Sequence, residues 1–294
     1  MTTIAGKTVL LTGASRGIGA ILARELIIEK ANIVGVSRSQ ESLNRVEDTV
    51  NALGGQWIGI PFDISRVEEL PALISQIEQL AGSIDILINN AGIEIYKNFQ
   101  DYSTSEIQSV LNTNLLAAME LTRLVLSNML SRRCGHIVNI ASLAAKKGSP
   151  YNSVYSASKA GLIMWSDAIR QELLGTGVAI SVICPGYISG QGMTANTGVP
   201  IPRLSGMSTP EKTVKATISA IAKNQAEAIV NQDFVTEALT KLLFAVGQFF
   251  PRFGDAVYRW LGVTKLNQMR MKKLDDGESR NKKAKTTYTG KLIR

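Results

Sequence analysis

The stretch Thr12-Gly13-Ala14-Ser15-Arg16-Gly17-Ile18-Gly19 decides the fold class of this chain of 294 residues. It joins a short apolar run at residues 8–12 to a segment with helical periodicity at residues 17–29. Glycines there let the backbone turn tightly and approach a pyrophosphate, which then lies at the helix N-terminus. The spacing is G-x-x-x-G-x-G, and glycine-rich turns also occur for purely structural reasons. The position between a first strand and a first helix favours a dinucleotide-binding turn.

Short apolar runs alternate with amphipathic segments along the next two hundred residues. Strands that are nearly all apolar and interleaved with helices are typical of a parallel sheet covered on both faces. Together with right-handed crossovers, this pattern predicts a doubly wound α/β Rossmann fold with a seven-stranded parallel sheet and a C-terminal helical extension. The strands are predicted at residues 8–12, 33–37, 57–61, 84–89, 136–141, 179–184 and 228–230, and the helices at 17–29, 41–53, 67–80, 105–130, 153–174 and 210–223.

The charge divides the chain unevenly. The net charge is +8, and the residues from Lys265 onward contribute ten Lys/Arg and three Asp/Glu, which leaves the body nearly neutral. A nucleic-acid-binding protein would carry a basic face on its folded domain, so we expect no nucleic-acid partner. We expect a cofactor-binding and catalytic domain at 1–232, an apolar helical extension at 233–264, and a basic tail at 265–294 that is disordered, most clearly from residue 275.

The composition also argues against a secreted or membrane-spanning protein. Two cysteines, Cys134 and Cys184, indicate neither a disulfide framework nor a metal site. The first apolar run is too short for a signal peptide, and no apolar stretch is long enough to span a bilayer. We therefore expect a cytoplasmic protein without a bound metal.

The end of the second predicted strand indicates which nicotinamide cofactor binds. NAD sites place an acidic residue there to bond the ribose 2′-hydroxyl. This chain has Ser37 and Arg38 instead, and Arg16 in the glycine loop can reach the same position. A guanidinium attracts a 2′-phosphate, so the sequence favours NADP(H) over NAD(H). The alternative is that Arg38 is only a solvated charge at a strand end.

Several motifs occur in an order that resembles the short-chain dehydrogenase/reductase superfamily in its single-domain form, from about residue 7 to residue 230. After the glycine loop come Asp63, the run Asn89-Asn90-Ala91-Gly92 and the run Asn112-Thr113-Asn114-Leu115. Ser142, the pair Tyr155 and Lys159, and Pro185-Gly186 complete the series. Within the superfamily the chain is most similar to 3-oxoacyl-thioester reductases and to a cyanobacterial ketoacyl-reductase-like group associated with heterocyst pattern formation.

The stretch Ser153-Val154-Tyr155-Ser156-Ala157-Ser158-Lys159 carries the predicted proton-transfer chemistry. Tyr155 and Lys159 are four residues apart, so they share one face of a helix. A nearby ammonium favours tyrosinate, so we expect Lys159 to lower the pKa of Tyr155 and to let it act as general acid or base toward a carbonyl. Ser142, after the fifth strand, is expected to hydrogen-bond the substrate oxygen as it gains negative charge.

The resemblance implies further roles. Asn114 holds a water that links Lys159 to solvent, Asp63 contacts the adenine, and Asn89 and Gly92 line the ribose side of the cofactor. Threonine is frequent in the family where this chain has Gly190, and Ser189 or Thr194 is the expected substitute. The complete set of expected cofactor-binding residues is Gly13, Ser15, Arg16, Gly17, Ile18, Gly19, Ser37, Arg38, Asp63, Ile64, Asn90, Ala91, Gly92, Tyr155, Lys159, Pro185, Gly186 and Ile188.

The sole histidine, His136, does not fit a hydrolytic triad. It begins the fifth strand, and an extended strand separates it from Ser142 by about 20 Å. We interpret His136 as an exposed residue at the start of that strand.

The segments after the sixth strand bear on substrate and location. We expect residues 186–206 to form a mobile lid with an apolar set, Tyr187, Met193, Val199 and Ile201. The apolar residues 239–250 and the aromatic run that follows are either a terminal helix packed on the body or subunit interface, or a hairpin in a membrane interface. Both readings stay open, as does a homodimer or homotetramer.

These observations predict an NADPH-dependent reductase of a lipid-like ketone, such as a 3-oxoacyl thioester, with Tyr155 as proton donor. The alternative is a regulatory protein in cell patterning that kept the fold and can dispense with catalysis.

Overall fold

The computed structural model describes residues 2–188, 193, 199 and 207–274. Strands and helices alternate along the described chain as the sequence predicts. The strands are β1 (Thr8–Thr12), β2 (Asn32–Ser37), β3 (Gln56–Pro61), β4 (Ile86–Asn89), β5 (Gly135–Ile140), β6 (Val178–Pro185), β7 (Tyr187–Ile188), β8 (Met207–Ser208) and β9 (Glu227–Val230). The helices are α1 (Gly17–Ile28), α2 (Gln40–Ala52), α3 (Leu70–Ala81), α4 (Thr104–Leu111), α5 (Ala117–Ser131), α6 (Ser153–Glu172), α7 (Pro210–Lys223), α8 (Phe234–Phe249) and α9 (Pro251–Trp260).

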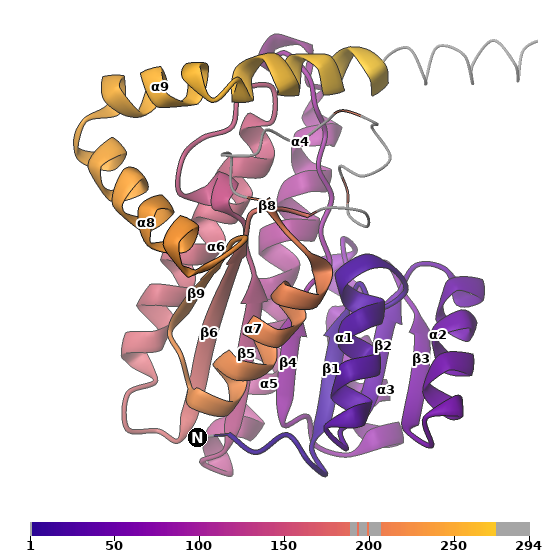
Figure 1. Ribbon diagram of the computed structural model, residues 1–294. Helices are drawn as coiled ribbons and strands as arrows, with labels where there is room; N and C mark the ends of the chain where they lie inside the picture. The colour runs from indigo at the N-terminus through magenta and orange to yellow at the C-terminus, as the bar shows by residue number, and fades with distance from the viewer. Residues whose placement is uncertain (1, 189–192, 194–198, 200–206, 275–294) are drawn as a thin grey trace, which may run out of the picture.

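Seven of the strands form one parallel sheet in the order β3-β2-β1-β4-β5-β6-β9, which confirms the predicted Rossmann fold. The strand order reverses direction between β1 and β4 (Figure 1). Because all seven strands are parallel, the loops after them emerge at one edge of the sheet. Ligands of open α/β sheets bind at that edge, beside the point where the strand order reverses.

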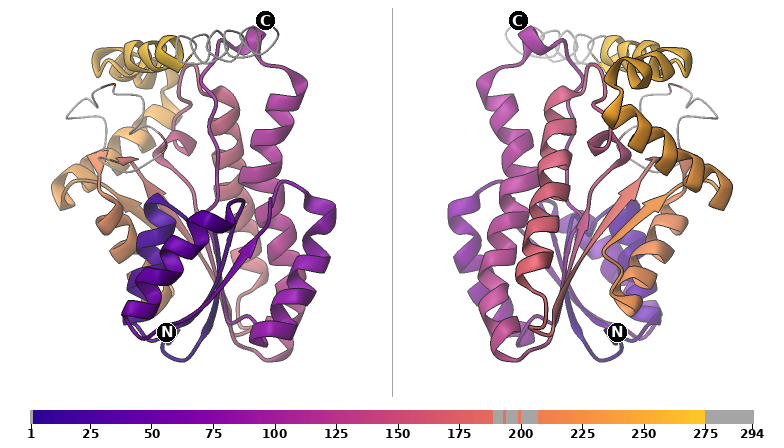
Figure 2. Two further views of the ribbon diagram at one scale, coloured as in Figure 1. Left: turned by 90° about the vertical axis from the view of Figure 1, so that its right-hand side faces the viewer. Right: turned by 90° about the vertical axis from the view of Figure 1, so that its left-hand side faces the viewer.

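Two helical layers cover the sheet (Figure 2). Val9 and Leu11 of β1 pack with apolar side chains of α1, α2 and α7. Leu10, between them, packs on the opposite face with α3 and α5. Alternate residues of one strand therefore enter different cores, which explains why every residue of β1 is buried and why the strands read as continuous apolar runs.

The structure corrects the predicted helix at residues 105–130. That segment is divided into α4, a π-helical turn at Asn112–Leu116, and α5. A π-helical turn is a local widening that is frequent at functional sites. Helical periodicity continues through such a turn, so the sequence pattern did not reveal it. The small parallel pair of β7 and β8 was likewise not predicted.

The C-terminal extension packs on the body along its inner side. Phe244 of α8 packs on a core cluster of β6 and α6, and α9 meets α8 where Gly254 approaches Gly247. Lys147 forms an ion pair with Asp255 at 2.6 Å. The outer side of the same extension leaves Leu242, Phe249, Phe250, Phe253 and Trp260 exposed. No helix in the described part of the chain is both long and apolar enough to cross a membrane.

The structure also corrects the start of the expected disordered tail. A helix covers residues 263–274 and lies over the body in line with α9 (Figure 1). Asn267, Arg270 and Met271 of this helix are buried, because it docks on the loop before α6. The basic charge of this segment did not reveal its buried inner face, which is formed by Val263, Leu266 and Met271. Residues 275–294 lie outside the described residues, and the threefold division of the chain stays a prediction.

His136 is not the exposed residue that the sequence suggested. It is fully buried, because β5 is a central strand and the N-terminal segment covers its start. Its Nδ1 lies 3.1 Å from Thr2 Oγ1 and its Nε2 lies 2.9 Å from Ser181 Oγ. Burial lowers the pKa of His136 from 6.5 to about 4.

Acid should therefore destabilise this protein through its one histidine. The unfolded chain binds the proton below about pH 6.5 whereas the folded chain does not until about pH 4, so stability falls as the pH is lowered through that window. The loss is on the order of 2–3 kcal/mol. Urea unfolding of the wild type and of His136→Gln at pH 7 and pH 5 measures it. The variant should be less stable at pH 7 but lose less on acidification; an equal loss in both proteins would contradict the assignment.

Candidate functional site

One cavity of about 750 Å³ opens at the edge where the parallel strands end, a volume typical of cofactor and substrate sites. It collects residues from loops that are far apart in the sequence. Apart from Asn89, Asn114 and the candidates outside the described part of the chain, every predicted site residue lines it: Gly13, Ser15, Arg16, Gly17, Ile18, Gly19, Ser37, Arg38, Asp63, Ile64, Asn90, Ala91, Gly92, Ser142, Tyr155, Lys159, Pro185, Gly186 and Ile188.

The glycine loop is packed so closely that no side chain fits at two of its positions. Gly13 has a φ of +66°, and a methyl group there would lie 2.8 Å from Ala91 Cα. A methyl group on Gly19 would lie 2.0 Å from the carbonyl oxygen of Gly13. Asn90 fixes the loop from the other side, because its Nδ2 donates to the carbonyl oxygens of Thr12 and Gly13 at 3.0 and 3.2 Å. At Gly13 and Gly19 the loop thus presents backbone to the cavity, with no room for a side chain.

Two arginines lie at the loop end of the cavity. Arg16 immediately precedes α1, and Arg38 follows β2. Both are exposed, and no hydrogen bond or ion pair joins either side chain to another described residue. Between them, Ser37 Oγ donates to Ser15 Oγ at 2.7 Å. This arrangement can bind a phosphate group by charge, and it explains why an acidic residue is absent from the end of β2.

Tyr155, Ser142 and Lys159 lie together in the same cavity, at the end away from the two arginines. Lys159 is 3% exposed, its Nζ donates to the carbonyl oxygen of Ile140 at 2.7 Å, and burial lowers its pKa to about 8. The expected lowering of the Tyr155 pKa is wrong for the chain's own residues. Burial raises the pKa of Tyr155 well above 10, the charge of Glu94 acts in the same direction, and a hydrogen bond with Ser142 acts against both. The phenol is therefore protonated near neutral pH.

Asn114 and Asn89 are placed differently from the other candidates. Asn114, in the π-helical turn, lies behind the cavity wall; its Oδ1 accepts from Ile93 N at 2.8 Å and its Nδ2 donates to Ile93 O and Ser158 Oγ. Gly92 lies against both Asn114 Oδ1 and Lys159 Nζ. Asn89 does not line the cavity, since its Nδ2 donates to Asn139 Oδ1 at 2.8 Å inside the sheet.

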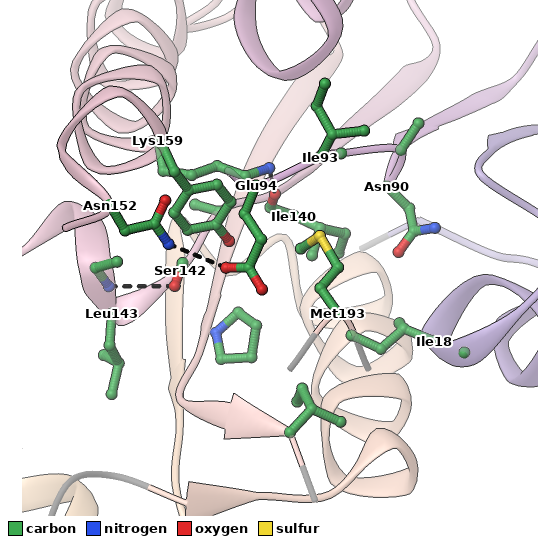
Figure 3. A pocket seen from close by; sticks show the side chains of 18 of the residues that line it. Ile18, Asn90, Ile93, Glu94, Ile140, Ser142, Leu143, Asn152, Lys159 and Met193 are labelled. Atoms are coloured by element: carbon green, nitrogen blue, oxygen red, sulfur yellow. Dashed lines mark hydrogen bonds between the residues drawn. The ribbon is translucent and has the colours of Figure 1, made fainter. Parts of the chain in front are cut away.

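Sequence reasoning missed two parts of the cavity wall. Glu94 lies two residues after Gly92 and accepts a hydrogen bond from Asn152 Nδ2 at 3.0 Å (Figure 3). An acidic residue between isoleucines was the signal available in the sequence. The second part comes from the C-terminal extension: Thr240, Leu243, Phe244, Gly247, Gly254, Val257, Tyr258, Leu261 and Val263.

Part of the predicted lid cannot be compared with the structure. Ser189, Gly190, Thr194 and Ile201 lie outside the described residues. Tyr187 and Met193 line the cavity, and Val199 is buried. Ile188 pairs with Ser208 in the small second sheet, which places the two ends of the 186–206 segment next to each other.

The chain is similar to known proteins along most of its length. The profile of the family described as short chain dehydrogenase matches residues 7–199. The ketoacyl reductase HetN of Nostoc sp. is 59% identical over 270 residues, 92% of this chain and 94% of that protein. The 3-oxoacyl-[acyl-carrier-protein] reductase FabG of Salmonella typhimurium is 32% identical over 183 residues, 62% of this chain and 74% of that protein. Among solved structures, a metagenomic short-chain oxidoreductase in complex with NADP has a TM-score of 0.68 at 28% identity and covers 79% of this chain and 100% of its own.

The packing of the glycine loop gives a direct test. Gly19→Ala should lower the stability by about 1–3 kcal/mol, because its methyl group meets backbone that cannot move aside. It should also abolish nucleotide binding. Thermal unfolding and fluorescence titration with NADPH measure both effects. Gly148→Ala is the matched control, since a methyl group there meets nothing within 4 Å. Wild-type NADPH affinity in Gly19→Ala would show that the loop is not the binding element.

Proposed function

The chain belongs to the short-chain dehydrogenase family, and on that premise we propose that it is an NADPH-dependent reductase of lipid-like ketones. The observation that carries the proposal is the meeting of Tyr155, Ser142 and Lys159 in the same cavity as the glycine loop. An oxidoreductase acting on CH–OH and C=O groups follows from the family and from the ketoacyl reductases among its relatives. The choice of substrate and the role of each side chain are our proposals.

The residues of the cavity fit NADP. The glycines of the loop leave room for a pyrophosphate at the N-terminus of α1. Arg16 and Arg38, with Ser37, would bind the 2′-phosphate, and Asp63 would bind the adenine side. Lys159, Asn90 and Gly92 would line the nicotinamide ribose. NADPH, when bound, supplies the hydride that reduces the carbonyl carbon.

The chain's own residues supply the proton. Because burial keeps the Tyr155 phenol protonated, it can donate its proton to the carbonyl oxygen as negative charge develops there. Ser142 donates a hydrogen bond to the same oxygen and so stabilises that charge. The ammonium of Lys159 then stabilises the tyrosinate until it takes up a proton from solvent. Asn114 acts as a positioning residue, because it fixes the Ile93 backbone and Ser158 beside Lys159.

The part of the cavity wall that the C-terminal extension forms favours a substrate with an apolar chain. The extension lines the cavity with four apolar side chains, those of Leu243, Phe244, Val257 and Leu261. Their apolar side chains would bind a hydrocarbon chain by burial, at about 25 cal/mol per Å². Relatives are named as reductases of ketoacyl or 3-oxoacyl groups, so 3-oxoacyl thioesters are the first substrates to test.

The remaining partners and the non-enzymatic alternative stay predictions. Phe249, Phe250 and Phe253 are exposed where α8 meets α9, and Trp260 is exposed at the other end of α9. Arg252 and Arg259 lie in the same stretch of chain. That composition is suited to a membrane interface or to a second copy in a homodimer or homotetramer. A regulatory protein that dispenses with catalysis would tolerate loss of the phenol.

Replacement of Tyr155 by Phe should abolish turnover, because the proton donor is lost while the ring remains. NADPH oxidation with 3-oxoacyl thioesters should fall by at least about a hundredfold, the usual contribution of general acid catalysis. NADPH affinity, measured by fluorescence, should stay within about threefold of the wild type, a shift of less than 1 kcal/mol. Turnover near the wild-type rate would overturn the proposed mechanism.

Replacement of Arg38 by Asp should shift the cofactor preference toward NADH. The carboxylate repels a 2′-phosphate and can accept a hydrogen bond from a 2′-hydroxyl. The kcat/KM ratio for NADPH over NADH should fall by at least about tenfold, the equivalent of one charged hydrogen bond. Arg45→Asp is the control, since Arg45 already pairs with Glu41 on the exposed side of α2. An unchanged ratio would remove Arg38 from the phosphate site.

A further inference from the structure

Glu94 is the acidic side chain at the end of the cavity that holds Ser142 and Tyr155. Hydride transfer and proton transfer do not explain its role. It points into the cavity near Ser142 and Asn152 (Figure 3). Its Oε2 accepts from Asn152 Nδ2 at 3.0 Å. Its Oε1 is buried and has no hydrogen bond of 3.5 Å or less to a described residue, and Tyr96 is a second hydrogen-bonding side chain that acts on this carboxyl. A buried carboxylate oxygen without a hydrogen-bond partner is unfavourable, so this oxygen is suited to accept a hydrogen bond from a ligand.

A buried arginine lies behind this acidic residue. Arg270, from the helix at 263–274, is fully buried, and its guanidinium carbon lies 4.6 Å from the Tyr187 ring centroid and 5.9 Å from that of Tyr96. Burial raises the pKa of Glu94, whereas Asn152, Tyr96 and the charge of Arg270 act to lower it. No ion pair of 4 Å or less joins the two residues in the described structure. The arginine therefore offsets the carboxylate charge without occupying its free oxygen.

The position of Glu94 is built by contacts from distant parts of the chain. Asn267 Nδ2 donates to Pro150 O at 2.9 Å and to Ser149 Oγ at 2.7 Å. These contacts hold the loop in which Tyr151 has a φ of +62° and from which Asn152 reaches Glu94. The same loop leads into α6 and Tyr155. Glu94 thus has a fixed position relative to Tyr155, the proposed proton donor. A residue that determines substrate specificity needs such a fixed position.

We propose that Glu94 determines substrate specificity by accepting a hydrogen bond from a hydroxyl group that the substrate carries within a few bonds of the reacting carbonyl. This inference rests on the proposed ketone reduction and defines its substrate more closely, as a hydroxy ketone with an apolar remainder. The hydroxyl pairs with Oε1, and the apolar remainder lies along Leu243, Phe244 and Val257.

The neighbourhood favours a neutral group over a charged one. A substrate cation beside Glu94 would also meet the positive charge of Arg270. A substrate carboxylate would meet the charge of Glu94 itself. A hydroxyl both donates and accepts hydrogen bonds, so it pairs with this carboxyl in either protonation state.

The experiment compares ketones that differ in one hydroxyl group. A nonan-2-one series with the hydroxyl on the first, second or third carbon from the carbonyl is measured against the parent ketone, at saturating NADPH. In the wild type, at least one hydroxy ketone should exceed the parent in kcat/KM by about tenfold or more, the equivalent of one hydrogen bond to a buried acceptor. Glu94→Leu should bring that ratio to about one, while Glu94→Gln, which keeps an acceptor oxygen, should retain most of it.

Controls separate specificity from damage. Glu172→Leu, an exposed change at the end of α6, should leave the ratio unchanged. Thermal unfolding and NADPH affinity of the Glu94 variants should match the wild type. Equal kcat/KM for all ketones in the wild type, or a preference that survives in Glu94→Leu, would overturn the inference while leaving ketone reduction intact.

Failure of the proposed function is a separate outcome. If no ketone is reduced, binding of each ketone to the NADPH complex is measured by calorimetry. Tighter binding of a hydroxy ketone in the wild type, lost in Glu94→Leu and kept in Glu94→Gln, still supports the role of Glu94. Equal binding by the wild type and Glu94→Leu overturns it.

Discussion

The parallel direction of the seven central strands is the constraint on which the site depends. Parallel pairing sends every loop that follows a strand to one edge of the sheet, and it buries both faces of the strands under helices. The glycine loop after β1, Arg38 after β2 and Ser142 after β5 come from different parts of the sequence, yet they line one cavity. The position of the site thus follows from strand direction, and its chemistry follows from the loops.

Burial sets the electrostatics of Tyr155 and Lys159. The same low-dielectric surroundings raise the pKa of Tyr155 and lower that of Lys159, so both groups are held closer to their neutral forms. A protonated phenol suits the reduction of a carbonyl, in which a proton must be donated. Glu94 reinforces this state, because its charge opposes formation of tyrosinate.

The C-terminal extension forms part of the cavity wall. Its α8 and α9 supply an apolar wall. From the helix at 263–274, Asn267 holds the loop before α6 and Arg270 lies over the ring of Tyr187, which lines the cavity. An apolar run with a basic end predicts equally well a packed helix and a membrane-facing one. The structure has an inner side that packs and an outer side with exposed aromatic residues, a division set by contacts that no local pattern contains.

The sequence by itself determined the fold class and indicated nearly all of the residues that line the cavity around the glycine loop. It could do so because glycine geometry, alternating apolar runs and the Tyr155–Lys159 spacing are local properties. Local periodicity could not reveal the π-helical turn at Asn114 or the burial of His136, since both depend on what packs against them. Only the tertiary structure decided that Glu94 pairs with Asn152 in the cavity wall and that the charge of Arg270 acts on the same carboxyl. Glu94 and Asn152 are 58 residues apart in the sequence, and Arg270 reaches them through the docking of the last described helix.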